Sequence, residues 1–147
     1  MEVFTDEYFM QRAIAEAQKA MEEDEIPIGA VVVYENAIIG KGYNQTEKLN
    51  DVTAHAEMLA ITAAASYLNS KFLDECTLYV TIEPCLMCAG AIKWARFHKI
   101  VFGAGEPKTG FTRISKDLLG KKTQISGGVM AEECAALMQH FFKQKRN

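Results

Sequence analysis

Residues 76–88 read CTLYVTIEPCLMC. The part from Cys76 to Ile82 is rich in β-branched and apolar residues, which predicts a buried strand. Pro84 follows closely, and because proline suits the first turn of a helix, we expect a helix from Cys85 to Ala95. The two cysteines of this turn are three positions apart, so both thiols can reach one metal ion. The stretch therefore predicts a strand that leads directly into a metal-binding helix start.

The remaining elements alternate in the same way on either side of this stretch. Thr5 is a good N-cap for a first helix with apolar residues at helical spacing from Phe9 to Met21. The acidic run 22–25 is expected to be solvated. It should form the end of that helix, because Pro27 prevents its continuation. The other expected elements are a hairpin of Gly29–Tyr34 and Ala37–Gly42, a helix from about Thr53 or Ala54 to Leu68, strands at Lys99–Phe102 and near Thr123–Ser126, an irregular segment over Gly103–Gly128, and an amphipathic helix at Ala131–Lys145 with Cys134, Leu137, Met138, Phe141 and Phe142 on one side. This order predicts an α/β fold with a mixed sheet covered on both faces by helices.

A second motif, His55-Ala56-Glu57, precedes Pro84-Cys85-Leu86-Met87-Cys88. Together they match the H-x-E…P-C-x-x-C signature known from zinc-dependent nucleobase deaminases. His55, Cys85 and Cys88 can hold Zn²⁺ with one coordination position left open, and Glu57 is the candidate for proton transfer. Residues two apart diverge by about 200° around a helix, so His55 and Glu57 can converge only at its first turn. We therefore expect two helix starts to face each other at the carboxyl ends of strands.

Other interpretations of these motifs stay open at the level of the residues. A C-x-x-C pair alone also occurs in redox proteins and in structural zinc sites. A closed four-ligand site could be completed by Cys76, Cys134, His98 or His140, although all four lie in or near apolar runs where packing is the ordinary role.

Size and composition favour an ordinary globular protein. The chain of 147 residues is expected to form a single domain over 1–147, with 49% hydrophobic and 24% charged residues. The net charge of −3 does not by itself favour a nucleic-acid partner, and the basic tail 143–146 is most simply a solvated terminus. No stretch approaches the ~20 apolar residues of a membrane span. The N-terminus is acidic and lacks the layout of a signal peptide. Four cysteines in such a chain are expected to be reduced thiols, which predicts a cytoplasmic location.

Over nearly its whole length the sequence resembles the bacterial tRNA-specific adenosine deaminases of the cytidine deaminase-like superfamily. The metal motif indicates only the superfamily, and the flanking stretches carry the closer resemblance. These stretches are Ile26–Val32, Gly42–Asn44, Thr53–Met58, Thr77–Cys85, Phe102–Ala104, Pro107–Gly110, Glu133–Leu137 and Phe141–Lys143.

The resemblance implies a three-layer α-β-α fold with a five-stranded mixed sheet, a homodimer, and one Zn²⁺ per subunit. It implies that the wobble adenosine of a tRNA anticodon stem-loop becomes inosine. Carried over to this sequence, His55, Cys85 and Cys88 bind zinc and Glu57 moves protons, while Asn44 and the backbone of Ala56 hold the purine and Ile28 lines the pocket. The candidate RNA contacts are Lys108, Arg113, Phe142 and Lys143.

The sequence departs from the better-known members of the family at Gly105-Glu106, where a basic residue and a shorter aspartate are common. Three rival functions remain. A deaminase of free guanine or cytosine suits the acidic net charge, and residues 91–96 are reminiscent of guanine deaminases. A non-catalytic zinc module would need no spare carboxylate at Glu57. Nothing in the sequence favours a zinc hydrolase of unrelated chemistry.

Overall fold

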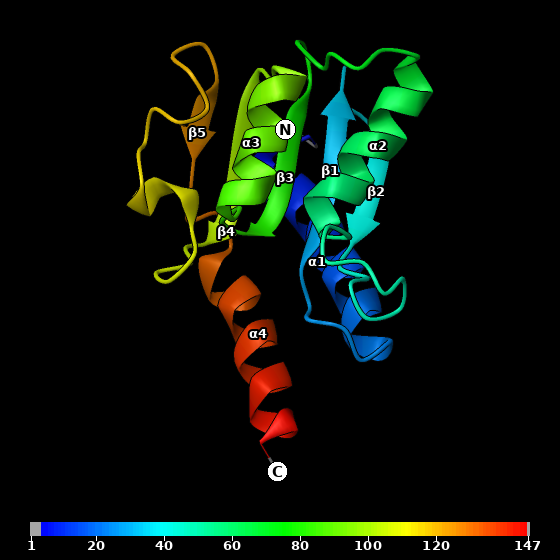
Figure 1. Ribbon diagram of the computed structural model, residues 1–147, viewed down its shortest axis with the longest axis vertical. Helices are drawn as coiled ribbons and strands as arrows, with labels where there is room; N and C mark the ends of the chain where they lie inside the picture. Colours follow the sequence, from blue (N-terminus) through cyan, green and yellow to red (C-terminus); the bar gives the residue numbers. More distant parts are fainter. Residues whose placement is uncertain (1–3, 147) are drawn as a thin grey trace.

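The computed structural model describes residues 4–146 and has one central sheet between helices (Figure 1). Its elements alternate along the chain, as the sequence predicts. They are α1 (Asp6–Glu22), β1 (Gly29–Tyr34), β2 (Ala37–Tyr43), α2 (Ala56–Leu68), β3 (Thr77–Ile82), α3 (Leu86–Ala95), β4 (Lys99–Ala104), the 3₁₀ turn η1 (Phe111–Arg113), β5 (Gln124–Ser126) and α4 (Ala131–Lys145).

The sheet has five strands in the order β2-β1-β3-β4-β5. β1 pairs antiparallel with both β2 and β3, whereas β3, β4 and β5 run parallel. The hairpin needs only a short turn, while the parallel pair β3–β4 needs a crossover, which α3 supplies. The five-stranded mixed sheet is therefore confirmed.

Two hydrophobic clusters lie on opposite faces of the sheet, because side chains alternate along a strand. Val32 and Leu78 contribute to the cluster beneath α2 and α3, and these two helices lie in front of the sheet in Figure 1. Val31 and Tyr79 contribute to the other cluster, together with α1 and α4. Both faces are covered, which confirms the three-layer α-β-α arrangement.

Two glycines of β2 bring α2 unusually close to the sheet. A Cβ atom at Gly40 would lie 2.5 Å from the carbonyl oxygen of Ala60, and one at Gly42 would lie 2.5 Å from that of Ala56. Both distances are far below van der Waals contact, so only hydrogen fits at these positions. Since Ala56 is the first residue of α2, Gly42 helps to set where that helix begins.

The predicted helix starts need small corrections. α2 begins at Ala56 with His55 as its N-cap, and α3 begins at Leu86 with Cys85 as its N-cap. The earlier start expected near Thr53 is wrong because Asp51 accepts hydrogen bonds from the amide and hydroxyl of Thr53, at 2.8 and 2.7 Å, which hold this segment in a turn.

Two other predictions differ from the structure in instructive ways. β4 continues to Ala104 in place of ending at Phe102, because Ala104 pairs with Ile82 of β3 and Gly103 lets the strand pack closely against Cys134 of α4. In the acidic run, Glu25 is buried with only 1% of its surface exposed, so the prediction of a wholly solvated run is wrong there. Within residues 4–146, no helix has the length and apolar character that crossing a membrane requires.

Candidate active site

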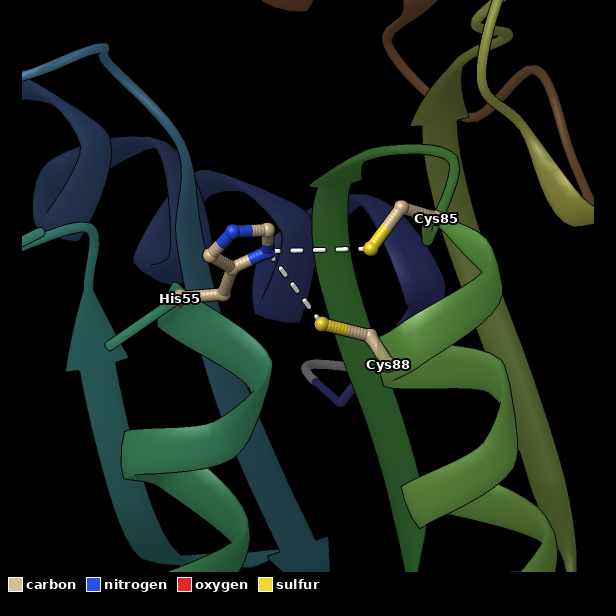
Figure 2. A group of neighbouring side chains, drawn as sticks. All are labelled: His55, Cys85 and Cys88. Atoms are coloured by element: carbon tan, nitrogen blue, oxygen red, sulfur yellow. Dashed lines mark hydrogen bonds between the residues drawn. The ribbon is translucent and has the colours of Figure 1, made fainter. Parts of the chain in front are cut away.

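Two helix starts face each other at one edge of the sheet. His55 caps α2 and Cys85 caps α3, and Figure 2 shows the imidazole pointing toward the thiols of Cys85 and Cys88. α3 follows the carboxyl end of β3, and the antiparallel neighbour β1 brings the carboxyl end of β2 to the same edge. The predicted opposition of helix starts is confirmed.

The three ligand atoms have the spacing that a tetrahedral zinc ion requires. Nδ1 of His55 lies 3.4 Å from Sγ of Cys88 and 3.7 Å from Sγ of Cys85, and all three atoms lie within 4.8 Å of one another. Zinc binds sulfur at about 2.3 Å and imidazole nitrogen at about 2.0–2.1 Å, so tetrahedral angles place nitrogen and sulfur about 3.5 Å apart. The donor set and its geometry therefore fit Zn²⁺. We call His55, Cys85 and Cys88 the zinc triad.

No fourth ligand joins the zinc triad among the residues that the structure describes. Cys76 is buried in the cluster under α2 and α3, and Cys134 is buried in the cluster on the opposite face. His98 and His140 are exposed at other places on the surface. A closed four-ligand site built from these residues is therefore wrong, and the arrangement leaves one coordination position for a reactant.

The thiols occupy an environment that favours a thiolate. A hydrogen bond from Cys88 and one from His55 outweigh burial and lower the pKa of Cys85 to about 4, whereas the same hydrogen bond and burial raise the pKa of Cys88. Two thiolates this close repel each other unless a cation lies between them. The N-terminus of α3 adds a favourable positive potential. The pair is therefore suited to a divalent metal that neutralises both charges.

Glu57 is buried in the first turn of α2, next to the zinc triad. Its side chain is 4% exposed. Burial raises the pKa of Glu57 to about 7, and the nearby Cys85 thiolate adds to the increase, while His55 and Cys88 act to lower it. A carboxyl group whose pKa lies near neutrality can both accept and donate a proton.

A small cavity of about 120 Å³ opens beside the zinc triad. The structure brings together here the residues expected to hold the base. Ile26, Ile28, Asn44, Thr46, His55, Ala56 and Glu57 line it. The amide of Asn44 donates to the carbonyl of Ile28 at 3.1 Å, and the amide of Gln45 donates to that of Ala54 at 3.0 Å. These bonds tie the end of β2 both to the segment before β1 and to the segment before His55.

The predicted RNA contacts gather only in part. Lys108 and Phe142 line one groove of about 640 Å³, together with Met138 and Arg146 of the C-terminal segment. Arg113 donates to the carbonyl of Lys108 from η1. Lys143 is exposed on α4 and does not line this groove.

The expected apolar side of the last helix also needs a correction. Phe142 is 39% exposed, whereas Phe141 next to it is buried. Consecutive residues differ by about 100° around a helix, so both rings cannot face the core equally. In the basic tail, Lys145 pairs with Asp24 at 2.6 Å, so this lysine is held against the turn after α1.

Of the buried glutamates that were not identified from the sequence, two accept hydrogen bonds from distant backbone amides. Glu25 accepts hydrogen bonds from the amides of Glu47 and Lys48, at 3.1 and 2.7 Å. Glu83 accepts three hydrogen bonds, one from Glu106 after β4 and two from Thr112 of η1. The only signal for Glu83 is its place directly before Pro84 in the motif, and a charge there is ordinarily expected to face solvent.

The fold and the site define the class of zinc-dependent deaminases, in which a three-ligand metal and a non-ligand glutamate act on a nucleobase. The model of the cytidine and deoxycytidylate deaminase zinc-binding region matches residues 4–104. The chain belongs to this family and, within it, to the tRNA-specific adenosine deaminases.

Several relatives support this assignment. The chain is 43% identical to the tRNA-specific adenosine deaminase of Bacillus subtilis (strain 168), over 96% of this chain and 91% of that protein. It is 40% identical, with a TM-score of 0.83, to a structure from work on A-to-I editing by tRNA:A34 deaminases at the wobble position of transfer RNA, over 88% of this chain and 98% of the other. A guanine deaminase from Bacillus subtilis is 39% identical, with a TM-score of 0.67, over 79% and 76% of the two chains.

Proposed function

We propose that the protein converts adenosine to inosine at the wobble position of a tRNA anticodon loop, in a hydrolysis that consumes water and releases ammonia. The observation that carries this proposal is the open zinc triad with Glu57 beside it, in a chain that is 43% identical to a tRNA-specific adenosine deaminase. The residues of the site indicate hydrolytic deamination. The similarity over 96% of the chain supports tRNA as the substrate.

His55, Cys85 and Cys88 would hold one Zn²⁺ per subunit. Zinc, when bound, lowers the pKa of a coordinated water toward neutrality. Glu57 accepts a proton of the attacking water and delivers it to the ring nitrogen next to C6. It then assists protonation of the departing amine, so that a carbonyl remains on the base. Its burial keeps bulk water from competing for these protons.

The cavity next to the zinc triad would hold the splayed adenine. Asn44 is 5% exposed and lines the cavity. Its side-chain amide can both donate a hydrogen bond to a purine and accept one from it. Ala56 offers backbone groups at the start of α2, and Ile28 supplies an apolar surface for the ring. The rest of the anticodon loop would then lie over the edge of the sheet.

The groove between the segment after β4 and α4 would contact the RNA on either side of the target base. Lys108 and Arg146 offer cations for phosphates, and the half-exposed ring of Phe142 can stack on a base. Arg113 is attached to Lys108 through its hydrogen bond to the carbonyl of that residue, and Lys143 follows Phe142 on α4. The local positive charge explains how a chain with a net charge of −3 can bind RNA.

We also infer a homodimer that uses the exposed side of α3, and a cytoplasmic location where tRNA is modified. Trp94 is 81% exposed and Leu86 54% exposed. Large apolar side chains gathered on one helix are typical of a protein–protein contact. Size-exclusion chromatography with light scattering checks this, because Trp94→Glu should convert a dimer into a monomer.

The substrate is tested by incubating the zinc-loaded protein with an anticodon stem-loop RNA and, in parallel, with free guanine, cytosine and adenosine. Inosine in the RNA supports the proposal. Ammonia released from free guanine alone would instead support the chemistry of the Bacillus subtilis guanine deaminase that the chain also resembles.

A further inference from the structure

Glu83 is a buried carboxylate that the proposed chemistry does not use. It is 7% exposed and lies two positions before Cys85, yet it is not one of the three converging metal ligands. Both of its oxygens accept hydrogen bonds from one segment, residues 105–113. Oε1 accepts from the amide of Glu106 at 3.0 Å, and Oε2 accepts from the amide and hydroxyl of Thr112 at 2.9 and 2.6 Å.

Gly110 packs closely against the same carboxylate. Its φ of −64° suits any residue, so its backbone conformation does not require glycine. Space does, because a Cβ atom there would lie 2.3 Å from the carboxyl carbon of Glu83. A Cβ atom at Gly105 would lie 3.5 Å from Oε1, which is an ordinary contact. Gly110 and Glu83 therefore depend on each other, and Gly105 does not take part.

The 105–113 loop also contacts the start of α3 directly. The amide of Phe111 donates to the carbonyl of Pro84 at 3.0 Å, and Gly110 forms an isolated bridge with Cys85. The ring of Phe111 is fully buried in the core beneath α3. The loop is thus attached to the residues on both sides of Pro84 and passes directly beside the zinc triad.

We propose that Glu83 is a positioning residue for RNA: its carboxylate holds the 105–113 loop as a wall of the active site and orients Lys108 and Arg113 toward the bound anticodon. This inference rests on the proposed function. Burying a carboxylate is costly unless it is fully hydrogen-bonded, and three bonds to the two ends of one loop select a single loop conformation. Glu83 acts through the loop and makes no contact with the metal or the reacting atoms.

Glu83→Gln tests this with almost no change in shape. Glutamine keeps one acceptor oxygen, so its NH₂ group must face a donor from either Glu106 or Thr112, and one end of the loop is released. Gly110→Ala should have the same effect, because the added methyl group would displace the carboxylate of Glu83. Amide hydrogen exchange, measured without RNA, should become at least about tenfold faster within residues 105–113 in both variants. Gly105→Ala should keep the wild-type exchange rates.

Kinetics with an anticodon stem-loop RNA test the functional part. Glu83→Gln should keep its zinc and raise KM by about tenfold while kcat changes by less than about threefold, because the loop orients RNA and takes no part in chemistry. Glu83→Asp retains both carboxylate oxygens, so its KM should lie between the values of the wild type and of Glu83→Gln. Ile100→Val is the control for a general loss of stability, because it removes one methylene from the buried core. Its KM should remain that of the wild type.

The outcomes separate the two proposals. Wild-type protein that makes no inosine in the RNA contradicts the proposed function, while the exchange measurement still decides whether Glu83 holds the loop. Wild-type turnover with an unchanged KM in Glu83→Gln contradicts the positioning role alone. Unchanged exchange in Glu83→Gln contradicts the claim that Glu83 holds the loop. An equal KM increase in Ile100→Val contradicts the positioning role, because the KM effect would then follow from any loss of stability.

Discussion

The zinc triad and the 105–113 loop both contact the start of α3, but they are built in different ways. The ligands of the triad come from N-caps and first turns, where the backbone of a helix fixes the direction of each side chain. The loop has one short turn, η1, and its position depends on hydrogen bonds from its backbone to the buried Glu83. In the proposed function, rigid elements carry the chemistry and a loop held at a few points carries contacts to the RNA.

The largest contrast between the two regions should come from removing a ligand. His55→Ala deletes the only nitrogen donor of the zinc triad, so we expect loss of bound metal and of all measurable deamination. Metal analysis of the purified variant checks this, and His98→Ala, which removes an exposed histidine, should keep the metal. A zinc-loaded, active His55→Ala variant would contradict the assignment of the ligands.

The next largest effect should separate metal binding from proton transfer. Glu57→Gln keeps the shape of the side chain but cannot accept the proton, so kcat should fall by about 10²–10⁴-fold with zinc retained. Single-turnover rates together with zinc content measure this. Glu132→Gln, an exposed change on α4, is the matched control and should behave like the wild type. Wild-type turnover by Glu57→Gln would exclude its role.

A smaller effect should show that the triad depends on close packing behind it. Gly42→Ala places a methyl group against the carbonyl of Ala56, 2.5 Å from the ideal Cβ position, so the start of α2 must move. We expect the free energy of unfolding to fall by about 1–3 kcal/mol, together with weaker zinc binding. Thermal unfolding measures the first. Gly90→Ala, where a Cβ atom meets nothing within 4 Å, should not lower the Tm. Equal Tm values for the two variants would mean that the start of α2 can shift without loss of stability, which would contradict this prediction.

The smallest effect is expected from removing an exposed charge on the 105–113 loop. Lys108→Ala should raise KM for the RNA by a few fold and reduce the slope of log affinity against log salt by about one unit, without changing kcat. A salt titration of RNA binding checks both. Lys41→Ala removes an exposed charge from the edge strand β2 and should leave the salt slope unchanged. A large loss of kcat in Lys108→Ala would place this lysine in the chemistry and remove the contrast between the two regions.

Much of the triad region could be predicted because its signals are local. The alternation of elements follows from periodicity, and the strand–Pro84–cysteine order places two thiols at a helix start. The divergence of His55 and Glu57 around a helix required that both lie in a first turn, which is where they lie. Boundaries shifted by one to three residues. At the start of α2 the reason is that Asp51 accepts the backbone amide of Thr53, and at the end of β4 it is tertiary packing at Gly103.

The sequence by itself determined the ligand types, the order of the elements and the class of chemistry, because each depends on residues close together along the chain. The tertiary structure alone decided that the zinc triad has no fourth ligand within residues 4–146, and that Ile28, Asn44 and Glu57 share one cavity. It also decided that Glu25 and Glu83 are buried. Their partners lie 22 to 29 residues away in sequence, and whether a carboxylate meets enough amide donors to leave water depends on packing that no local pattern encodes.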